Sequence, residues 1–412
     1  MKLGITAASI LAATVGLTSS ASAEDIEIWV RTGIGEGFTK LVEAYNAAHE
    51  DKIVLTQVPF SEMVQKYAIA IAGGEAPDAL SLDLIYNPAF SAAGQLEDLT
   101  EWAKALPYFA TLSPGHVANG TFDGKIYGLP LTVETSVLAW NKDLYAAAGL
   151  DPEKAPSSWD EITANAEKIT ALGDETYGFY FSGGNCGGCM IFTFAPLVWG
   201  AGADILSADG TQATLDTPQM RKAIDIYRNF VQQGFVPEGA ATDNGTNFNT
   251  FMNGKIGMQS LGAFAIGTLV TQHPDINFGV TLIPGVEGGP SSFAGGDNLV
   301  ITKGSDKVDA VKGFLEYAYS MDGQKLLAQY GSLPSRSDIA CEVLAGMDPR
   351  LSVAAEAVTV AKTPVTTQFN DLINSANGPW ATFTSAAIFN EDVDGAFAKG
   401  QADMQMVIDM GQ

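Results

Sequence analysis

Histidine and cysteine are scarce in this sequence: the 412-residue chain contains three of each. The histidines are scattered, and no second pair of possible ligands stands at metal-binding spacing from Cys186 and Cys189. A zinc site is therefore the least favoured interpretation of the cysteines. We expect neither a metal nor an organic cofactor.

Basic residues are also few: 22 lysines and arginines stand against 47 aspartates and glutamates, which gives a net charge of −25. Nucleic acids and anionic membranes carry negative phosphate groups that would repel such a chain. We therefore expect neither as a partner. Acidic residues spread this widely are typical of a solvated surface, so they do not identify a ligand.

Beyond residue 17 the sequence has no apolar run long enough to span a membrane. Its start has the pattern of a secretory signal peptide: Lys2, an apolar segment 3–17 and a small-residue cleavage site, Ala-Ser-Ala, at 21–23. We predict a mature chain that begins at Glu24 and is exported to the periplasm. No cysteine stands at the cleavage point, so we expect no lipid anchor there.

The Cys-Gly-Gly-Cys motif at Cys186 and Cys189 has two further interpretations. In an oxidising compartment this spacing favours a local disulfide, with Cys341 left as a free and buried thiol. A thioredoxin-type redox site is less favoured, because no strand–helix unit opens at the motif. We predict the disulfide.

The signatures of hydrolytic enzymes are missing as well. No Gly-x-Ser-x-Gly nucleophile elbow occurs in the sequence. A glycosidase needs two carboxyl groups in different protonation states, for which Asp83 and Glu134 are candidates, but nothing in the sequence marks either one as the acid. We therefore expect a binding protein rather than an enzyme.

Residues 121–150 are the most informative stretch that the sequence does contain. Asp123-Gly124 is a hairpin signal, because glycine adopts positive φ without steric cost. The segment 125–131 has the pattern of a strand whose regular pairing ends at Pro130, since proline has no amide donor. A polar patch with Glu134 follows, and then a second apolar strand at 137–140. Such a patch between two strands suits a crossing from one lobe to another.

Strand and helix patterns alternate along the rest of the chain. The segment 25–30 alternates around Trp29, and residues 36–48 have the pattern of an amphipathic helix. The segments 53–58 and 63–72 repeat this order. Such alternation favours an α/β fold with largely parallel sheets.

Short motifs follow one another in a specific order. They are Pro-Asp at 77–78, Gly-x-Leu-x-Asp-Leu at 94–99, Gly-Lys-Ile-Tyr-Gly-Leu-Pro at 124–130, Trp-Asn-Lys-Asp-Leu at 140–144, Phe-x-x-Phe-x-x-Gly-Lys-x-Gly-Met at 248–258 and a late segment at 323–336. Together they resemble the solute-binding proteins of sugar ABC importers, of which the maltose-binding protein is the best-known kind. The resemblance extends over nearly the whole mature chain.

The resemblance implies a fold, its boundaries and a partner. The fold would be an α/β, two-lobed periplasmic-binding-protein fold with hinge crossings and a ligand cleft between the lobes. After the signal peptide, 1–23, the N-terminal lobe would take residues 24–132 and 285–332, with a return crossing near Pro284. The C-terminal lobe would take residues 133–284 and 333–412. An inner-membrane ABC permease would be the partner of a monomeric binding protein.

A sugar presents hydroxyl groups and apolar ring faces, so its site needs carboxylates, amides and aromatic rings. Glu134 is the leading candidate, because it matches the family's carboxylate after the proline-containing strand. Phe264 and Trp380 match positions of cleft aromatics, although Phe and Trp are more often core residues. The predicted ligand-binding residues are Arg31, Thr32, Asp83, Tyr86, Glu134, Asn185, Phe264, Gly296, Asp297, Arg336 and Trp380.

Two classes of ligand stay open at this point. The first, and the one that the resemblance favours, is a mono- or oligosaccharide or a sugar derivative. The second is a phosphorylated polyol or another small polar metabolite. Convergence of Arg31 and Arg336 on one end of the cleft would support the second class.

Overall fold

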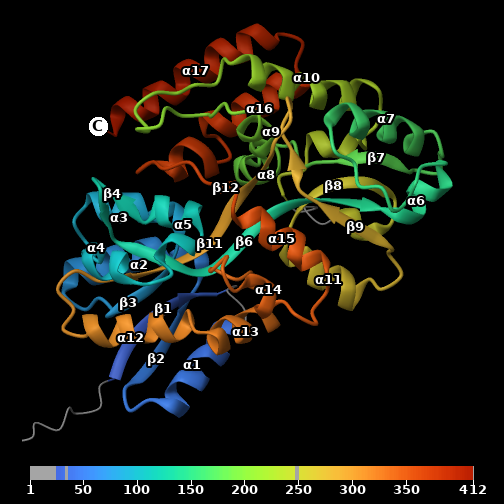
Figure 1. Ribbon diagram of the computed structural model, residues 1–412. Helices are drawn as coiled ribbons and strands as arrows, with labels where there is room; N and C mark the ends of the chain where they lie inside the picture. The colour runs from blue at the N-terminus through green and yellow to red at the C-terminus, as the bar shows by residue number, and fades with distance from the viewer. Residues whose placement is uncertain (1–24, 33–35, 246–249, 412) are drawn as a thin grey trace, which may run out of the picture.

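The computed structural model describes residues 25–32, 36–245 and 250–411, which form a mixed α/β protein of two lobes (Figure 1). The two-lobed fold that the sequence motifs imply is thereby confirmed. The predicted signal peptide and its cleavage site lie outside the described residues. Among the helices of the described segments, none has both the length and the apolar character needed to cross a bilayer.

Most of the strands belong to one ten-stranded sheet, whose main path runs β2-β1-β3-β11-β6-β8-β7. Strands β10 and β12 pair with β11, β9 pairs with β6, and β4 and β5 form a separate hairpin. The strands are β1 (Asp25–Arg31), β2 (Lys52–Val58), β3 (Ala79–Asp83), β4 (Thr121–Phe122), β5 (Lys125–Ile126), β6 (Gly128–Asn141), β7 (Tyr177–Tyr180), β8 (Ile256–Gly262), β9 (Phe278–Thr281), β10 (Ile283–Pro284), β11 (Pro290–Ile301) and β12 (Ala361–Lys362).

The helices cover the faces of this sheet and build the C-terminal end of the chain (Figure 1). The α-helices are α1 (Glu36–Ala48), α2 (Phe60–Gly73), α3 (Asn87–Ala92), α4 (Thr100–Ala105), α5 (Pro114–Asn119), α6 (Lys142–Ala147), α7 (Trp159–Thr170), α8 (Gly187–Thr193), α9 (Ala195–Gly200), α10 (Pro218–Gln232), α11 (Phe264–Gln272), α12 (Val308–Ala318), α13 (Met321–Gln329), α14 (Ala340–Val343), α15 (Arg350–Val358), α16 (Pro379–Phe389) and α17 (Val393–Met410). Short 3-10 helices are η1 (Leu84–Tyr86), η2 (Phe109–Thr111), η3 (Glu238–Ala241) and η4 (Thr250–Asn253), and η5 (Asn370–Asn374) is a π-helical turn.

The sheet is mixed, which corrects the expectation of largely parallel pairing. Strand β1 pairs in parallel with β2 and β3, and β7 pairs in parallel with β8. Strands β6 and β11, in contrast, run antiparallel to each other and to most of their other neighbours. The parallel strands come from strand–helix alternation, whereas the two long strands join the lobes.

Strand β6 is a single strand of 14 residues, where the sequence predicted two strands separated by a polar patch. Pro130 lies inside it, and the register against β11 shifts between Asp297 and Asn298, opposite this proline. Residues 128–135 of β6 pair with β11, whereas residues 136–141 pair with β8 and β9. The polar patch therefore lies where β6 passes from one lobe to the other.

Strand β11 carries the chain back between the lobes. Pro284 lies in β10, which pairs with the first residues of β11. Residues 294–300 of β11 then pair with β6, and residues 297–301 pair with β3 in the first lobe. Figure 1 shows β6 and β11 side by side through the centre of the molecule, with β1, β2 and β3 at one end and β7 and β8 at the other.

Separate hydrophobic cores lie on the two sides of these crossings. One is built from residues of β1, α1, α12 and neighbouring elements, including Ile28, Phe38 and Phe314. The other, larger core includes Phe179 and Trp380. The predicted lobe limits, 24–132 with 285–332 and 133–284 with 333–412, stay a proposal.

Candidate functional site

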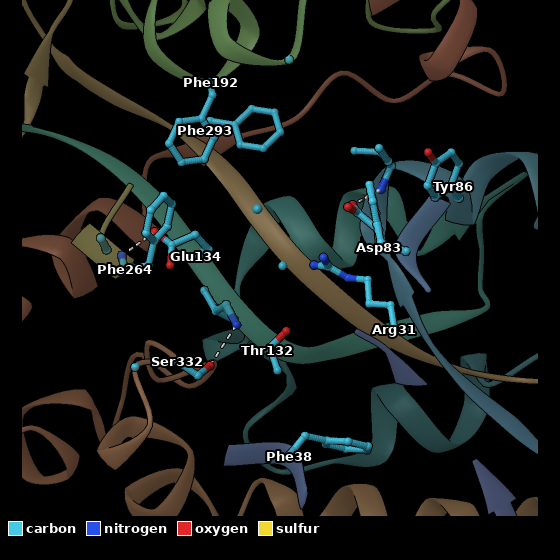
Figure 2. Close-up of a pocket in the computed structure, with 18 of the residues that line it drawn as sticks. Arg31, Phe38, Asp83, Tyr86, Thr132, Glu134, Phe192, Phe264, Phe293 and Ser332 are labelled. Atoms are coloured by element: carbon cyan, nitrogen blue, oxygen red, sulfur yellow. Dashed lines mark hydrogen bonds between the residues drawn. The ribbon is translucent and has the colours of Figure 1, made fainter. Parts of the chain in front are cut away.

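A cleft of about 1650 Å³ is lined by residues that the sheet brings together from distant parts of the chain. Its floor is formed by β6 and β11, with Thr132 and Glu134 on one strand and Phe293 and Gly296 on the other. In Figure 2, Arg31, Asp83 and Tyr86 face Glu134 and Phe264 across these strands. The cleft therefore lies over the two strands that connect the lobes.

The first wall is made by segments that follow the parallel strands. Arg31 is the last residue of β1, and Asp83 is the last residue of β3. The carboxyl ends of parallel strands meet at one edge of a sheet, which is the usual place for a ligand in such folds. Asp83 also accepts a hydrogen bond from the backbone N–H of Ile85 (3.3 Å) and so begins the turn that carries Tyr86.

Arg31 is held by a fully buried aspartate behind the cleft surface. Its Nε lies 2.7 and 3.0 Å from the two carboxylate oxygens of Asp297, and its Nη2 lies 2.6 Å from Oδ1. Asp297 is 0% exposed and also accepts a hydrogen bond from the hydroxyl of Ser81 (2.9 Å). The charge of Arg31 is therefore largely compensated by the protein itself.

The pKa of Asp83 is raised to about 7. Burial is the largest cause, and the nearby Asp297 raises the pKa further, while the guanidinium of Arg31 opposes both effects.

The pKa of Glu134 is raised to about 8, again mainly by burial. The backbone amides of Phe264, Ala263 and Thr135 oppose the shift, and the Phe264 N–H lies 3.2 Å from Oε1. At pH 7 the side chain therefore mostly carries a proton. In that state it can donate one hydrogen bond to a ligand oxygen while it accepts another from α11.

Six of the predicted ligand-binding residues lie together in the cleft: Arg31, Asp83, Tyr86, Glu134, Phe264 and Gly296. Phe264 begins α11 and leaves 45% of its surface exposed, so its ring is available to a ligand. Asn374, from the other side of the cleft, lies near the Tyr86 hydroxyl and opposes the rise of its pKa that burial causes.

The other five predicted residues do not line the cleft. Thr32 follows Arg31, and its hydroxyl accepts the N–H of Phe60 (3.4 Å). Asp297 lies behind the surface as the partner of Arg31. Asn185 is exposed on the loop before α8, with φ of 55°.

Arg336 and Trp380 are the two larger corrections. The guanidinium of Arg336 binds Asp338 (2.6 Å) and the carbonyl of Tyr319 (3.0 Å), and it lies over the ring of Tyr108. Trp380 is 0% exposed, because it packs between the rings of Phe194 and Phe383 in the core. Each side chain is already occupied by partners within the protein.

The sequence interpretation missed most of the aromatic rings in the cleft. These are Phe38, Phe60, Phe192, Phe293, Tyr330 and Phe369. Phe192 packs against Phe293 with ring centroids 5.2 Å apart. Phe60 and Phe293 could have been found, since the first follows a predicted strand and the second precedes Gly295-Gly296. Phe192 and Phe369 had no local signal that separates them from core residues.

The cysteines follow the predicted pairing, but not the predicted burial. Cys186 and Cys189 are joined in a disulfide. Cys341 is free, as predicted, yet it is exposed rather than buried, because it lies on the short surface helix α14. Within the described segments no group of three or more His, Cys, Asp or Glu residues is arranged to hold a metal ion.

Comparison with known proteins gives a family and a set of structural relatives. The sequence profile of the family described as bacterial extracellular solute-binding protein matches residues 29–325. The diacetylchitobiose-binding protein DasA of Streptomyces coelicolor is 25% identical over 407 residues, which cover 93% of this chain and 91% of the relative.

Two solved structures share the fold over nearly the full length. The cyclic alpha-maltosyl-1,6-maltose binding protein of Arthrobacter globiformis superposes with a TM-score of 0.84 at 25% identity, covering 94% of this chain and 99% of that protein. The sugar-binding protein MalE of Xanthomonas citri superposes with a TM-score of 0.83 at 22% identity, covering 94% of this chain and 98% of the other.

Proposed function

Because this chain belongs to the bacterial extracellular solute-binding proteins, we propose that it captures a sugar between its two lobes and delivers it to the membrane permease of an ABC importer. The observation that carries the proposal is the cleft, in which aromatic rings and hydrogen-bonding side chains are mixed. Rings such as Phe192 and Phe264 offer flat apolar faces, and Asp83, Glu134 and Asn374 offer hydrogen bonds. Sugars need both kinds of partner.

The ligand is an oligosaccharide rather than a single sugar unit. The cleft volume of about 1650 Å³ exceeds the ~300–1,000 Å³ that is usual for pockets that hold a small ligand. Lining residues from α2, α8, α11 and η5 surround a space that several linked sugar rings would fill. Closure of the lobes would reduce this volume around the bound chain.

The charges of the cleft favour an uncharged ligand over a phosphorylated polyol. Arg31 is the one lysine, arginine or histidine among the described lining residues, and Asp297 already compensates its charge. Arg336, the second cation that a phosphate site would need, is bound to Asp338 outside the cleft. The other ionisable groups that line the same space, Asp83, Glu134 and Asp371, are carboxyl groups, whereas a phosphate site would need cations.

The relatives favour binding without hydrolysis. The family and the proteins compared above are described as binding proteins. We therefore propose that this protein binds its sugar without cleaving it.

Export, location and partner follow from the same proposal. The protein works in the periplasm as a monomer, and a permease in the inner membrane recognises its closed form. It needs no cofactor, because capture and release are equilibrium steps.

A ligand panel read by thermal shift tests the proposal. The panel contains diacetylchitobiose, cyclic maltosyl-maltose, maltotriose, glucose and sn-glycerol 3-phosphate. A ligand that binds only the folded state stabilises it and so raises the melting temperature. At a ligand concentration of 100 times the dissociation constant, the stabilisation is about 2.7 kcal/mol. We expect an oligosaccharide to give the largest rise, with one molecule bound per chain and no product on chromatography.

Two results would contradict the proposal. If sn-glycerol 3-phosphate gave the largest rise in melting temperature, the ligand would be a phosphorylated polyol rather than a sugar. Release of shorter sugars during incubation would make the protein an enzyme.

A further inference from the structure

The second lobe holds its disulfide directly behind one wall of the cleft. Cys186 and Cys189, bonded at a sequence separation of 3, enclose the first turn of α8. The sulfur of Cys186 accepts the N–H of Cys189 (3.2 Å), so the disulfide also caps the helix. Gly188, Ile191 and Phe192 of this helix line the cleft.

One side of the disulfide lies on a loop that is fixed by a buried carboxylate. A Cβ atom on Gly245 would stand only 3.0 and 3.1 Å from the two sulfur atoms, so the loop approaches the disulfide as closely as glycine allows. The N–H of Gly245 donates to Asp243 (3.0 Å). Asp243 also accepts hydrogen bonds from Tyr180 (2.7 Å) and Ser182 (2.6 Å).

The other side of the enclosed turn packs against η5. A Cβ atom on Gly187 would stand 1.7 Å from the carbonyl oxygen of Ile373, which only glycine permits. The indole N–H of Trp380 donates to the carbonyl of Gly187 (3.2 Å). Trp380, which was predicted to face the ligand, therefore holds the turn enclosed by the disulfide through this hydrogen bond.

This packing continues across the cleft. Asn374 is the last residue of η5, and its Oδ1 lies next to Gly188. Its side chain lies near the hydroxyl of Tyr86 of the first lobe. The turn that the disulfide closes thus supports both the wall that carries Phe192 and a contact between the lobes.

A disulfide that closes so short a loop has mainly a local effect. The stabilisation that a cross-link gives through the unfolded chain grows with the length of the closed loop. Here the loop is minimal, while the segments packed on it contribute residues to the cleft. Its main consequence is therefore the geometry of the wall.

We propose that the Cys186–Cys189 disulfide is a positioning element of the cleft, which fixes the wall formed by Gly188, Ile191 and Phe192 against η5. Reduction by a dithiol breaks the S–S bond, each sulfur becomes a thiol, and the dithiol is oxidised to its own disulfide. The wall then loses its fixed geometry while both lobes keep their cores. The effect on ligand affinity rests on the proposed sugar-binding function, but the effect on the wall does not.

Hydrogen exchange of the full-length mature protein tests the effect on the wall. The oxidised protein is compared with the same protein in dithiothreitol and with the double variant Cys186→Ser/Cys189→Ser. Amides of residues 187–193 should exchange about tenfold faster in both reduced and substituted protein. Amides of α11, another element of the second lobe that lines the cleft, should not change. The variant Cys341→Ser, which removes the exposed free thiol, is the matched control and should behave like the oxidised protein.

Two exchange results would overturn the proposal. Unchanged exchange in residues 187–193 would mean that packing alone fixes the wall. Equal acceleration in α8 and α11 would mean that the disulfide acts on global stability instead.

Affinity provides the second measurement. Diacetylchitobiose and cyclic maltosyl-maltose are titrated into oxidised, reduced and reoxidised protein by calorimetry. The proposal predicts at least about fivefold weaker binding after reduction, and recovery after reoxidation. Equal affinity before and after reduction would overturn the role in binding. Absence of binding to either sugar in the oxidised protein would count against the proposed function, while the exchange result would still decide the role of the disulfide in the wall.

Discussion

Glu134 links the floor of the cleft to α11 through its hydrogen bond with the N–H of Phe264. Its pKa of about 8 in the folded protein lies above its ordinary value of 4.5. The folded protein therefore binds more protons than the unfolded chain between these two pH values, and the free energy of unfolding falls as the pH rises through this range. The contribution of Glu134 is complete below pH 4.5 and is lost above pH 8.

We predict that Glu134→Gln, which keeps the neutral shape, removes this decline. Melting temperatures of variant and parent, measured from pH 4.5 to 8.5, should diverge as the pH rises, with the variant relatively more stable at the alkaline end. Asp209→Asn is a suitable control: hydrogen bonds from Ser207 and Thr211 lower the pKa of Asp209 to about 2, so its contribution is lost only in acid. Parallel profiles for Glu134→Gln and its parent would show that Glu134 does not titrate in this range.

Phe264 and Trp380 were both predicted to bind the ligand through their aromatic rings, yet they lie in very different surroundings. Phe264 is 45% exposed in the cleft, whereas Trp380 is 0% exposed and has core partners. We predict that Phe264→Ala weakens sugar binding by about 1–2 kcal/mol, through loss of apolar contact, and changes stability little. Trp380→Ala should cost about 3–5 kcal/mol of stability, because it leaves a large cavity.

Denaturant unfolding and calorimetric titration of the two variants measure both effects. Phe264→Ala with full affinity would remove this ring from the site. A stable Trp380→Ala protein would contradict its role in the core.

At the level of elements, the geometry of the cleft floor depends on close contact between β6 and β11. Gly296 has φ of 110°, and a Cβ atom there would stand 2.1 Å from the carbonyl oxygen of Thr132. Gly267, in the middle of α11, has nothing within 4 Å of the corresponding position. Both glycines line the cleft, but only Gly296 is required by the backbone.

We predict opposite effects of alanine at these two positions. Gly296→Ala should lower the free energy of unfolding by about 1–3 kcal/mol, since it forces a strained φ and a clash between the crossing strands. Gly267→Ala should raise it by about 0.5–1 kcal/mol, because alanine is the better helix former. Urea unfolding of the parent and both variants measures these changes. A Gly296→Ala protein as stable as the parent would show that Gly296 relieves no strain.

At the level of the whole molecule, the strands β6 and β11 join the two lobes, and they limit the places where one lobe can bend relative to the other. The pairing partner of β6 changes between residues 135 and 136, from β11 to β8. At this level Thr135 and Ser136 are both fully buried, and Ser136 is hydrogen-bonded to Ser292 of β11. A bend at this level would move α11 toward α2 and close the cleft.

We predict that a bound oligosaccharide favours a closed state, because it contacts both lobes at once. Small-angle scattering should show a smaller radius of gyration with saturating cyclic maltosyl-maltose or diacetylchitobiose, whichever gives the larger thermal shift. Phe264→Ala, which lacks one contact of the second lobe, should need more sugar to reach the same radius. A radius that stays constant at saturation would show that the protein binds without closing.

The sequence by itself determined many of the individual helices and strands, because their signals are local, whereas the family resemblance supplied the two-lobed layout. Strand–helix alternation and the hairpin at Asp123-Gly124 depend only on neighbouring residues, and the structure contains both. The same holds for Arg31 and Asp83, since a polar residue at the end of a strand is visible in a short window, whereas Glu134 was predicted from its match to the family's carboxylate.

Only the tertiary structure decided which polar and aromatic side chains face the cleft, because their partners are distant in sequence. Asp297 meets Arg31 across 266 residues, and Trp380 meets Gly187 across 193. No local pattern distinguishes Trp380, buried under the disulfide turn, from Phe264, exposed in the cleft. The polar patch at Glu134 likewise became part of one continuous strand, because pairing with β11 on one side and β8 on the other outweighs the local effect of Pro130.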